Sequence, residues 1–250
     1  MSDSAYLKFL QDSKSIIDEN KNKTIDASLV DNTNDWLTNH IADTYSSTIN
    51  EMNIIGITGT NGKTTTAYLT YQMLNKLGSK TAYIGTIGFY LPDEDFIELP
   101  NTTPNILDLY ELFLTAKEKG CKNVIMEVSS HALHQERVKG IKYKVAGFTN
   151  LTQDHLDYHE TMDNYLAAKQ LILKQLTGPM IVNIDDPCGK KWLDIYDNCK
   201  SLGKNANNYN IVSYEDSHNG TLINFKVDGV EYEVETNLRS TFNVYNYLTA

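Results

Sequence analysis

Apolar residues recur along the middle of the chain with two different periods. Short apolar runs predict buried strands at residues 53–58, 80–84, 123–128, 143–150 and 179–184. Apolar residues at helical spacing predict helices at residues 64–77, 105–119 and 162–176. Strands that alternate with helices form β-α-β units, which build a parallel sheet covered on both faces. We therefore predict an α/β fold with a doubly wound, mostly parallel sheet and flanking helices.

The two ends of the chain depart from this pattern. Residues 222–227 and 231–235 flank Asp228-Gly229, which predicts a small β-hairpin. Residues 1–50 are polar, with helical spacing from Ser4 to Ile17 and a small, weakly specified unit over 26–50. We expect a short N-terminal segment at 1–50 and a central domain at 51–250.

Charge and composition narrow the class of protein. The formal net charge of −10 argues against general binding to nucleic acid or to anionic membranes, because both are polyanions. No run approaches the roughly 18 apolar residues of a membrane span, and the N-terminus lacks the features of a secretory signal. Cys121, Cys188 and Cys199 form no Cys-x-x-Cys pair, so we interpret them as structural. We expect a cytoplasmic protein without a nucleic-acid or membrane partner.

The strongest local feature is a glycine-rich loop between a predicted strand and a predicted helix. Its sequence is Gly56-Ile-Thr-Gly59-Thr-Asn-Gly62-Lys63-Thr64-Thr65. Glycines let successive N–H groups point at one phosphate, and the helix N-terminus adds its positive dipole end. Lys63 would neutralise the β- and γ-phosphates of ATP, and the Thr64 hydroxyl would ligate Mg²⁺. Ile57 stands where the strict pattern has glycine, so the loop is a variant of the phosphate-loop type.

Residues 52–250 resemble the central ATP-binding domain of the Mur ligases, and most of all the UDP-N-acetylmuramoyl-tripeptide synthetases (MurE type). The resemblance rests on an ordered series of motifs: Gly59-Thr-Asn-Gly-Lys-Thr-Thr65, Asn101-Thr-Thr-Pro104, Glu127-Val-Ser-Ser-His-Ala-Leu133 with Gln135 and Arg137, Thr149-Asn-Leu-Thr-Gln-Asp-His-Leu-Asp157, Ala167-Ala-Lys169, Asn183-Ile-Asp-Asp-Pro187 and Phe242-Asn-Val-Tyr-Asn246. Each motif alone is weak, and their common order is the signal.

The resemblance implies a reaction in peptidoglycan synthesis. Such ligases use ATP and Mg²⁺ to convert a carboxylate of UDP-N-acetylmuramoyl-L-alanyl-D-glutamate into an acyl phosphate. The amine of a third amino acid, meso-diaminopimelate or L-lysine, then attacks it. The partners implied are therefore the UDP-N-acetylmuramoyl-dipeptide and a diamino acid. Metal ions offset the charge between the γ-phosphate and the carboxylate.

The resemblance also assigns site residues. The ATP-binding set is Gly59, Thr60, Asn61, Gly62, Lys63, Thr64, Thr65 and, near adenine, Asn183. The metal-binding set is Thr64, Glu127, His155 and Lys169, the last as a CO₂-derived carbamate, and the catalytic set is Lys63, His155 and Lys169. The substrate-binding set is Asn101, Thr102, Thr103, Ser129, Gln135 and Arg137. His159 and His218 are interpreted as structural, as are the otherwise unassigned His40, His131 and His134.

Carbamylation gives Lys169 a physical rationale. A carbamate replaces a cation that would repel Mg²⁺ with an anion that offers two oxygen donors. Glu127 ends a predicted strand beside the loop, where the ligands of parallel sheets bind.

The chain departs from the family at both ends. The N-terminal segment is shorter than a usual UDP-binding domain, and Asp31-Asn32-Thr33 stands where the family more often has Asp-Ser-Arg. The sequence ends just after Phe242-Asn-Val-Tyr-Asn246, where the family has a third, closing domain. We therefore expect a piece of a longer enzyme that binds nucleotide but has little or no ligase activity alone, because the closing domain aligns the reactants.

Three alternatives stay open at this point. The chain could be a folylpolyglutamate synthase or another Mur ligase, which share the loop and the domain plan. It could be a non-catalytic phosphate-loop module, although the Asn-Lys-x-Asp run of a guanine-specific switch is absent from the sequence. It could also be a structural α/β domain whose loop binds nothing.

Overall fold

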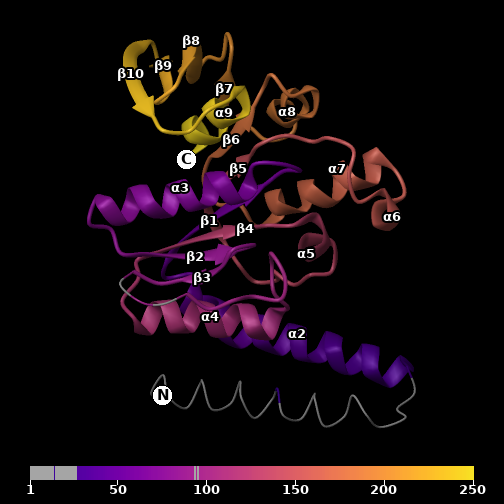
Figure 1. The fold of residues 1–250 in the computed structure, drawn as a ribbon. Helices are drawn as coiled ribbons and strands as arrows, with labels where there is room; N and C mark the ends of the chain where they lie inside the picture. The colour runs from indigo at the N-terminus through magenta and orange to yellow at the C-terminus, as the bar shows by residue number, and fades with distance from the viewer. Residues whose placement is uncertain (1–13, 15–26, 93, 95) are drawn as a thin grey trace.

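The computed structural model describes residues 14, 27–92, 94 and 96–250 of the chain. Apart from Lys14, the helix predicted from Ser4 to Ile17 lies outside these residues. In the described residues one ten-stranded sheet runs through the molecule in the order β10-β9-β8-β7-β6-β5-β1-β4-β2-β3 (Figure 1). Its strands are β1 (Asn53–Thr58), β2 (Thr81–Gly85), β3 (Gly88–Tyr90), β4 (Asn123–Glu127), β5 (Tyr143–Phe148), β6 (Met180–Asn183), β7 (Cys199–Gly203), β8 (Tyr209–Ser217), β9 (Gly220–Val227) and β10 (Val230–Thr236).

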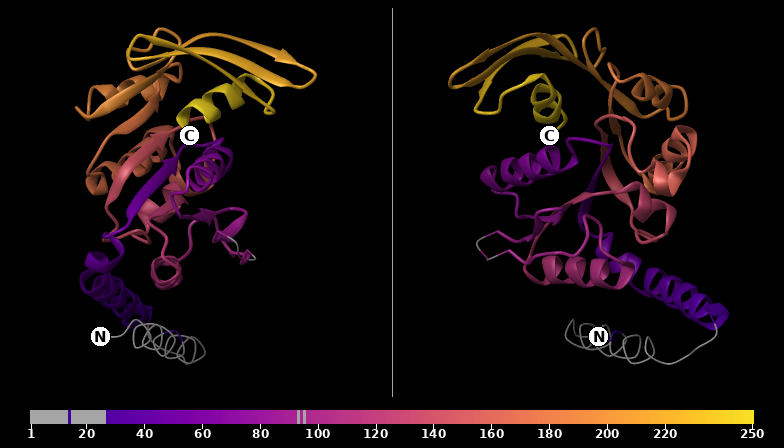
Figure 2. Two further views of the ribbon diagram at one scale, coloured as in Figure 1. Left: turned by 90° about the vertical axis from the view of Figure 1, so that its left-hand side faces the viewer. Right: turned by 45° about the vertical axis from the view of Figure 1, so that its right-hand side comes forward.

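The central part of the sheet is parallel and its two ends are antiparallel. All neighbours from β2 to β8 pair in parallel, whereas β3 pairs antiparallel with β2 at one end, and β8, β9 and β10 pair antiparallel at the other. The predicted hairpin is confirmed as β9 and β10. Asp228 and Gly229 both have positive φ, 48° and 90°, which matches the twist of a two-residue hairpin loop. The hairpin extends the main sheet across the top of the molecule (Figure 2).

The helices cover both faces of the parallel strands. They are α2 (Ala27–Ile49), α3 (Lys63–Lys76), α4 (Ile106–Glu118), α5 (Ser130–His134), α6 (Leu156–His159), α7 (Met162–Gln170), the 3₁₀ helix η1 (Leu171–Gln175), α8 (Pro187–Leu193) and α9 (Thr241–Thr249). Alternation along the strands separates two cores. Val124 and Met126 of β4 join the large core that includes α2 and α4, whereas Ile125 joins Ile57 and Tyr83 under α3. The predicted doubly wound α/β architecture is thus confirmed.

The described N-terminal residues form a long helix instead of a weakly specified unit. Helix α2 has 23 residues and packs on α4. Leu37, Ile41, Tyr45 and Ile49 are buried at a spacing of four, in the same core as the central strands. We expected a weakly specified unit at residues 26–50, and this was wrong. The apolar stripe of the helix is narrow and lies within a polar sequence, so its helical spacing was not recognised. The proposed domain boundary after residue 50 stays a prediction, although the packing of α2 crosses it.

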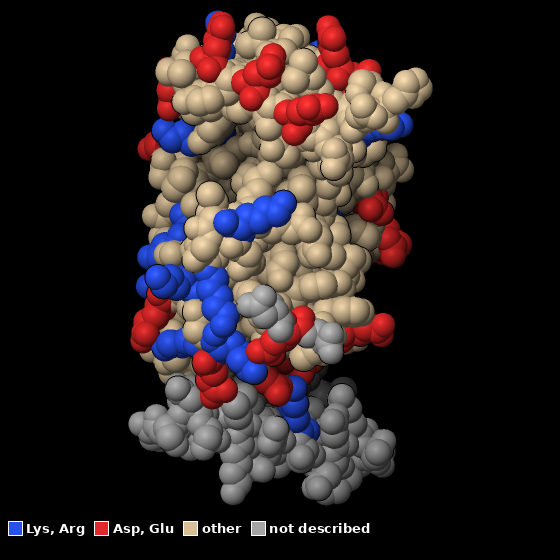
Figure 3. All heavy atoms as spheres, turned by 60° about the vertical axis from the view of Figure 1, so that its left-hand side comes forward, with Lys and Arg blue, Asp and Glu red and all other residues tan. Residues whose placement is uncertain are grey.

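Other boundaries differ in smaller ways. The helix predicted over 162–176 is α7 followed by η1, and strands β3, β7 and β8 were not predicted. None of the helices in the part of the chain that the structure describes has the length and apolar character needed to span a membrane. Acidic residues gather on the outer strands: Glu215, Asp216, Glu231, Glu233 and Glu235 are exposed on β8 and β10, and red side chains cap the top of the view in Figure 3.

Candidate active site

The glycine-rich loop lies at the carboxyl edge of β1, between the ends of β4 and β5. Gly59 and Gly62 have φ values of 144° and 84°, in the region that disfavours a side chain. A Cβ on Gly59 would lie 1.9 Å from Oγ1 of Thr149, and one on Gly62 would lie 2.2 Å from Oδ1 of Asn246. These two glycines are therefore required by close approach as well as by conformation. Helix α3 begins directly after Gly62, at Lys63.

Residues after β5 brace the loop from the side. The Thr60 N–H donates to the carbonyl oxygen of Asn150 at 2.8 Å, and the Asn61 N–H donates to Asn150 Oδ1 at 3.0 Å. Thr149 Oγ1 in turn donates to the carbonyl oxygen of Asn61 at 2.7 Å. The predicted loop residues are thus brought together, and their curvature is fixed by a second segment of the chain.

Two lysines converge on one carbonyl group of the loop. Lys63 Nζ donates to the carbonyl oxygens of Gly59 and Thr60 at 3.0 and 2.9 Å, and Lys169 Nζ donates to that of Gly59 at 2.8 Å. The Lys169 side chain is 1% exposed, and its ammonium lies 4.5 Å from the ring centroid of Tyr165. The surface position that helical periodicity favours for Lys169 is therefore excluded, because helix α7 turns this side chain inward.

Burial shifts the pKa of both lysines downward. Burial lowers the pKa of Lys63, against the attraction of Glu127 and Asp154. Burial, followed by repulsion from Lys63, lowers the pKa of Lys169 to about 6, with Asp154 opposing the shift. Lys169 is therefore mainly a neutral amine at pH 7, which is the form that reacts with CO₂.

Glu127 is the carboxylate at the centre of the site and is fully buried at the end of β4. Its Oε1 accepts from the Tyr83 hydroxyl at 2.5 Å and from the Thr86 N–H at 2.9 Å. Its Oε2 accepts from the hydroxyls of Thr64 and Thr86 at 2.9 and 3.2 Å. These donors compensate the cost of burying a charge. The predicted pair of Thr64 and Glu127 is thus in direct contact.

His155 lies near Tyr165 and is exposed. It has φ 52° just before α6, and its Nε2 lies 3.6 Å from Asp154 Oδ2. Its ring makes an edge contact with that of Tyr165 at 5.9 Å, and Lys169 Nζ contacts the same Tyr165 ring. The described residues hold no group of three His, Cys, Asp or Glu side chains suited to a metal ion.

Other histidines lie near His155, and their grouping was not predicted from the sequence. The His131 ring lies 4.9 Å from that of His155 and 5.3 Å from that of His159. His159 is buried, with Nε2 2.9 Å from Ser130 Oγ. Burial, with the charges of neighbouring histidines, lowers the pKa of His159 to about 4. This agrees with a neutral, structural His159.

The predicted substrate residues lie in two groups beside Glu127. Thr102 Oγ1 lies 3.0 Å from Thr86 Oγ1, next to the carboxylate. Thr103 is buried, donates to the Glu127 carbonyl oxygen at 2.9 Å and accepts from the Ser129 N–H at 3.1 Å. Its hydroxyl is therefore used to tie the 101–104 loop to β4. Asn101 is exposed on the same loop.

The second group surrounds α5. The Ser129 hydroxyl caps this helix by accepting from the Ala132 N–H at 3.2 Å. Arg137 donates from Nη1 to the Thr103 carbonyl oxygen at 3.1 Å and from Nη2 to Gln135. Gln135 also donates to the Tyr158 hydroxyl at 3.1 Å. Arg137 thus connects the two groups on one side of Glu127.

A cavity of about 430 Å³ opens on the other side of the glycine-rich loop. Asn183 lines it, donating to the Thr149 carbonyl oxygen at 3.0 Å and accepting from the Asp185 N–H at 3.0 Å. The other lining residues are Thr149, Asn150, Asp185, Asp186, Pro187, Thr241, Phe242, Tyr245, Asn246 and Thr249. The motifs at 183–187 and 242–246 therefore meet next to the loop and line this cavity together.

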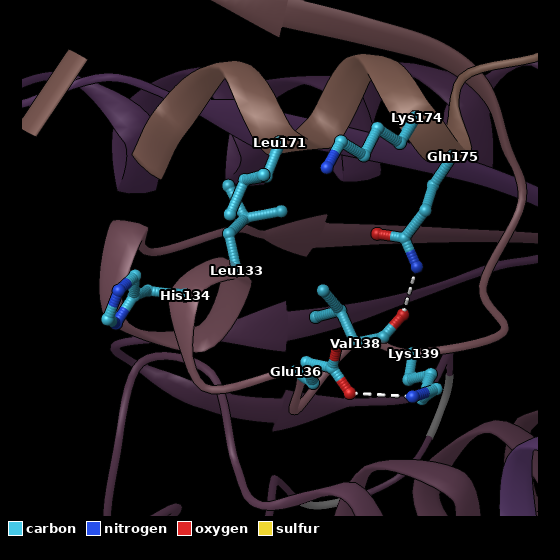
Figure 4. A pocket seen from close by; sticks show the side chains of 8 residues that line it. All are labelled: Leu133, His134, Glu136, Val138, Lys139, Leu171, Lys174 and Gln175. Carbon is cyan, nitrogen blue, oxygen red and sulfur yellow. Dashed lines mark hydrogen bonds and ion pairs between the residues drawn. The ribbon is translucent and has the colours of Figure 1, made fainter. Parts of the chain in front are cut away.

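A smaller cavity of about 180 Å³ lies outside the predicted site, between α5 and η1 (Figure 4). Three of its polar side chains are paired: Gln175 donates to the Val138 carbonyl oxygen at 2.6 Å, and Lys139 lies 2.6 Å from Glu136. None of the predicted site residues lines it.

Several residues of the site were not predicted to belong to it. Asn150 and Asn246 lie within the quoted motifs, and membership of a motif was the only available signal. Tyr83 and Thr86 carried no such signal, since their partner Glu127 lies more than 40 residues away in the sequence. Tyr165 lies one helical turn before Lys169, which was the only indication of their contact.

The sequence pattern of the Mur ligase middle domain matches residues 57–250, which is most of the chain. This chain belongs to the Mur ligase family. It is 40% identical over 217 residues to the UDP-N-acetylmuramoyl-L-alanyl-D-glutamate--2,6-diaminopimelate ligase of Bacillus licheniformis, covering 82% of this chain and 44% of that protein. It is also 40% identical over 201 residues to the ligase of the same name from Aquifex aeolicus, covering 80% of this chain and 41% of that protein.

A solved structure agrees with this Mur ligase assignment. That of a UDP-N-acetylmuramoyl-L-alanyl-D-glutamate--2,6-diaminopimelate ligase superposes with a TM-score of 0.74 at 28% identity, over 86% of this chain and 45% of the other. A folylpolyglutamate synthase from Mycobacterium tuberculosis has a TM-score of 0.65 at 13% identity, over 85% of this chain and 56% of the other, which shows a shared fold alone. The chain spans less than half the length of the curated relatives compared here.

Proposed function

We propose that this chain is the nucleotide-binding core of an ATP-dependent ligase of peptidoglycan synthesis in the cytoplasm. The proposed reaction joins a third amino acid to UDP-N-acetylmuramoyl-L-alanyl-D-glutamate. The observation that carries the proposal is the convergence of Lys63, Lys169 and the Thr64–Glu127 pair around one glycine-rich loop. We propose 2,6-diaminopimelate as the amine, because the relatives near 40% identity carry that name, with L-lysine as the alternative.

The residues around the loop suit the binding of ATP with Mg²⁺. Mg²⁺ prefers oxygen donors, and Thr64 Oγ1 and Glu127 Oε2 lie 2.9 Å apart. Lys169 is buried next to the same loop and is mainly neutral, so reaction with CO₂ would give it an oxygen donor there. We propose Thr64, Glu127, carbamylated Lys169 and, at a second position, His155 as the residues that hold Mg²⁺. The ion supplies charge neutralisation when bound.

The protein's own groups would then act on ATP in sequence. The loop N–H groups and the N-terminus of α3 would hold the phosphates, and Lys63 would turn from the loop carbonyls to the γ-phosphate. The carboxylate of the dipeptide attacks the γ-phosphorus, the bond to ADP breaks, and an acyl phosphate forms. The amine then attacks the acyl carbon, phosphate leaves, and the amine loses a proton as the amide forms.

The substrate carboxylate would approach from the side of Asn101, Thr102 and Arg137. Arg137 presents a planar group that pairs with carboxylate or phosphate oxygens, and the 101–104 loop lies beside Glu127. Adenine would occupy the cavity lined by Asn183, on the opposite side of the loop. In this arrangement the γ-phosphate would lie between the adenine cavity and the residues proposed to bind the dipeptide.

The proposal is tested by measuring ADP release with ATP, Mg²⁺ and each acceptor in turn. Because the chain aligns with only 44% of its relative, we expect slow release, dependent on the UDP-muramoyl-dipeptide and favoured by diaminopimelate over lysine. Where ADP release is too slow to measure, the affinities of the same acceptors are compared by calorimetric titration. A response to a folate acceptor and not to the dipeptide would contradict the proposal.

A further inference from the structure

The two oxygens of the buried Glu127 carboxylate have different kinds of partner. Oε1 accepts from the Tyr83 hydroxyl at 2.5 Å and from the backbone N–H of Thr86 at 2.9 Å. Oε2 accepts only from hydroxyl groups, those of Thr64 and Thr86. A backbone N–H has no lone pair to offer a cation, whereas a threonine hydroxyl can rotate and become a ligand. The two oxygens therefore differ: Oε1 is held by the protein, and Oε2 is available to a cation.

The position of Tyr83 in the sheet makes this contact. Strands β2 and β4 are parallel, with Tyr83 opposite Ile125, so Glu127 lies two residues further along on the same face. Gly85 completes the fit, since a Cβ there would lie 2.3 Å from both Glu127 Oε1 and the Tyr83 hydroxyl. Tyr83 and Glu127 thus meet in a space that a larger residue at 85 would fill.

The Tyr83 ring is held in place by other aromatic rings. It makes edge contacts with the rings of Tyr68, Tyr71 and Tyr90 at 5.6, 6.2 and 5.8 Å. Tyr83 itself is fully buried. Its hydroxyl donates to Glu127 Oε1 at 2.5 Å from this fixed ring position. The hydrogen bond is therefore preorganised.

We propose that Tyr83 is a positioning residue that makes Glu127 a one-oxygen cation ligand through Oε2, and that it thereby favours Mg²⁺ over Ca²⁺. The inference rests on the proposed function, since it concerns the cation that accompanies the nucleotide. Mg²⁺ needs few ligands in a strict octahedral arrangement, whereas Ca²⁺ accepts more oxygens and binds both oxygens of one carboxylate readily. Holding Oε1 on Tyr83 and the Thr86 N–H denies Ca²⁺ that second oxygen.

The test is calorimetric titration of a non-hydrolysable ATP analogue with Mg²⁺ or with Ca²⁺, for the parent chain and for Tyr83→Phe. The variant keeps the ring and removes the hydroxyl. We expect the Mg²⁺-supported affinity to fall about tenfold, the lower end of the loss when a ligand's hydrogen-bond partner is removed. The Ca²⁺-supported affinity should change by less than about threefold, because Oε1 becomes available to the larger ion.

The matched control is Tyr90→Phe, which removes one hydroxyl from the same ring cluster. It should leave both affinities at the parental values, with an unchanged melting temperature. Gly85→Ala disrupts the hydrogen bond between Tyr83 and Glu127 in another way, because the added methyl group would lie 2.3 Å from both oxygens. It should therefore also weaken Mg²⁺-supported binding more than Ca²⁺-supported binding. The Gly85→Ala titration replaces that of Tyr83→Phe if Tyr83→Phe is unfolded at the temperature of measurement.

The outcomes of these titrations distinguish a wrong role for Tyr83 from a wrong proposed function. Equal loss of both affinities in Tyr83→Phe, or no loss, while the parent binds the analogue with Mg²⁺, overturns the inference and leaves the function standing. A parent chain that binds no analogue with either cation contradicts the proposed function and the inference with it. A selective loss with Mg²⁺ supports both.

Discussion

Lys63 and Lys169 donate hydrogen bonds to the same oxygen atom, the backbone carbonyl of Gly59, at 3.0 and 2.8 Å. Two ammonium groups this close repel each other, so one gives up its proton more readily. Lys169 is the more deeply buried, and its pKa falls to about 6. Under the proposed function, Lys63 would be the cation that meets phosphate and Lys169 the neutral amine that reacts with CO₂.

The lowered pKa of Lys169 makes the stability of the fold depend on pH. In CO₂-free buffer between pH 6 and 10, the unfolded chain binds a proton at this lysine and the folded chain does not. Stability therefore rises with pH in this window, by up to about 1.4 kcal/mol per pH unit from this group alone. Lys169→Met should lose this part of the slope in denaturant unfolding at pH 7, 8 and 9.

Lys174→Met is the control for that measurement, because Lys174 is exposed in the following 3₁₀ helix. It should keep the parental dependence on pH. Equal slopes in the parent and in Lys169→Met would show that Lys169 is protonated in the folded chain, contrary to its burial.

Carbamylation of Lys169 should be detectable without catalysis. With ¹³C-labelled bicarbonate at pH 8, we expect a carbamate resonance in the folded chain that disappears in Lys169→Ala. It should weaken as the pH falls below about 6, because the protonated amine does not react. A signal of equal strength in Lys169→Ala would place the modification elsewhere.

Gly59→Ala should destabilise the fold and abolish nucleotide binding. The added methyl group meets Thr149 Oγ1 at 1.9 Å, and φ is 144°, so we expect a loss of about 2–4 kcal/mol in urea unfolding. Gly78→Ala is matched for positive φ, at 77°, but has open space around it. Its loss should stay near 1 kcal/mol, with binding intact. Equal losses would show that conformation alone requires these glycines.

Helix α2 should contribute to the stability of the central fold. Ile41 is fully buried in the large core, so Ile41→Ala should cost about 2–5 kcal/mol in a single cooperative transition. Trp36 lies on the same helix and is 62% exposed, so Trp36→Ala should cost less than about 0.5 kcal/mol. A separate early transition caused by Ile41→Ala would show that α2 is an independent unit.

The strands and the loop could be predicted because their signals are local. Strand β1, the loop and α3 follow one another without a gap, and Asp228-Gly229 sets the hairpin by conformation alone. Strand β8 was missed because much of it faces solvent and few of its residues are buried. Helix α2 was missed because the buried apolar residues of its described part, among them Leu37, Ile41 and Tyr45, stand in a mostly polar sequence.

The inner contacts of the site could not be predicted in the same way. Lys63, Thr64 and Lys169 were predicted from their motifs. The contact between Tyr83 and Glu127, in contrast, depends on the register of β2 against β4. The neutral state of Lys169 depends on burial by α7 and on the charge of Lys63. Neither quantity is a property of the local sequence, so both required the structure.

The most direct test of the account is calorimetric titration of the chain with a non-hydrolysable ATP analogue and Mg²⁺, beside Lys63→Ala and Lys76→Ala. Lys76 is exposed at the far end of α3 and serves as the control. We predict binding by the parent and by Lys76→Ala, and at least a tenfold loss in Lys63→Ala, about 1.4 kcal/mol or more. Equal binding by all three, or by none, would contradict a phosphate-binding role for the loop at residues 59–65.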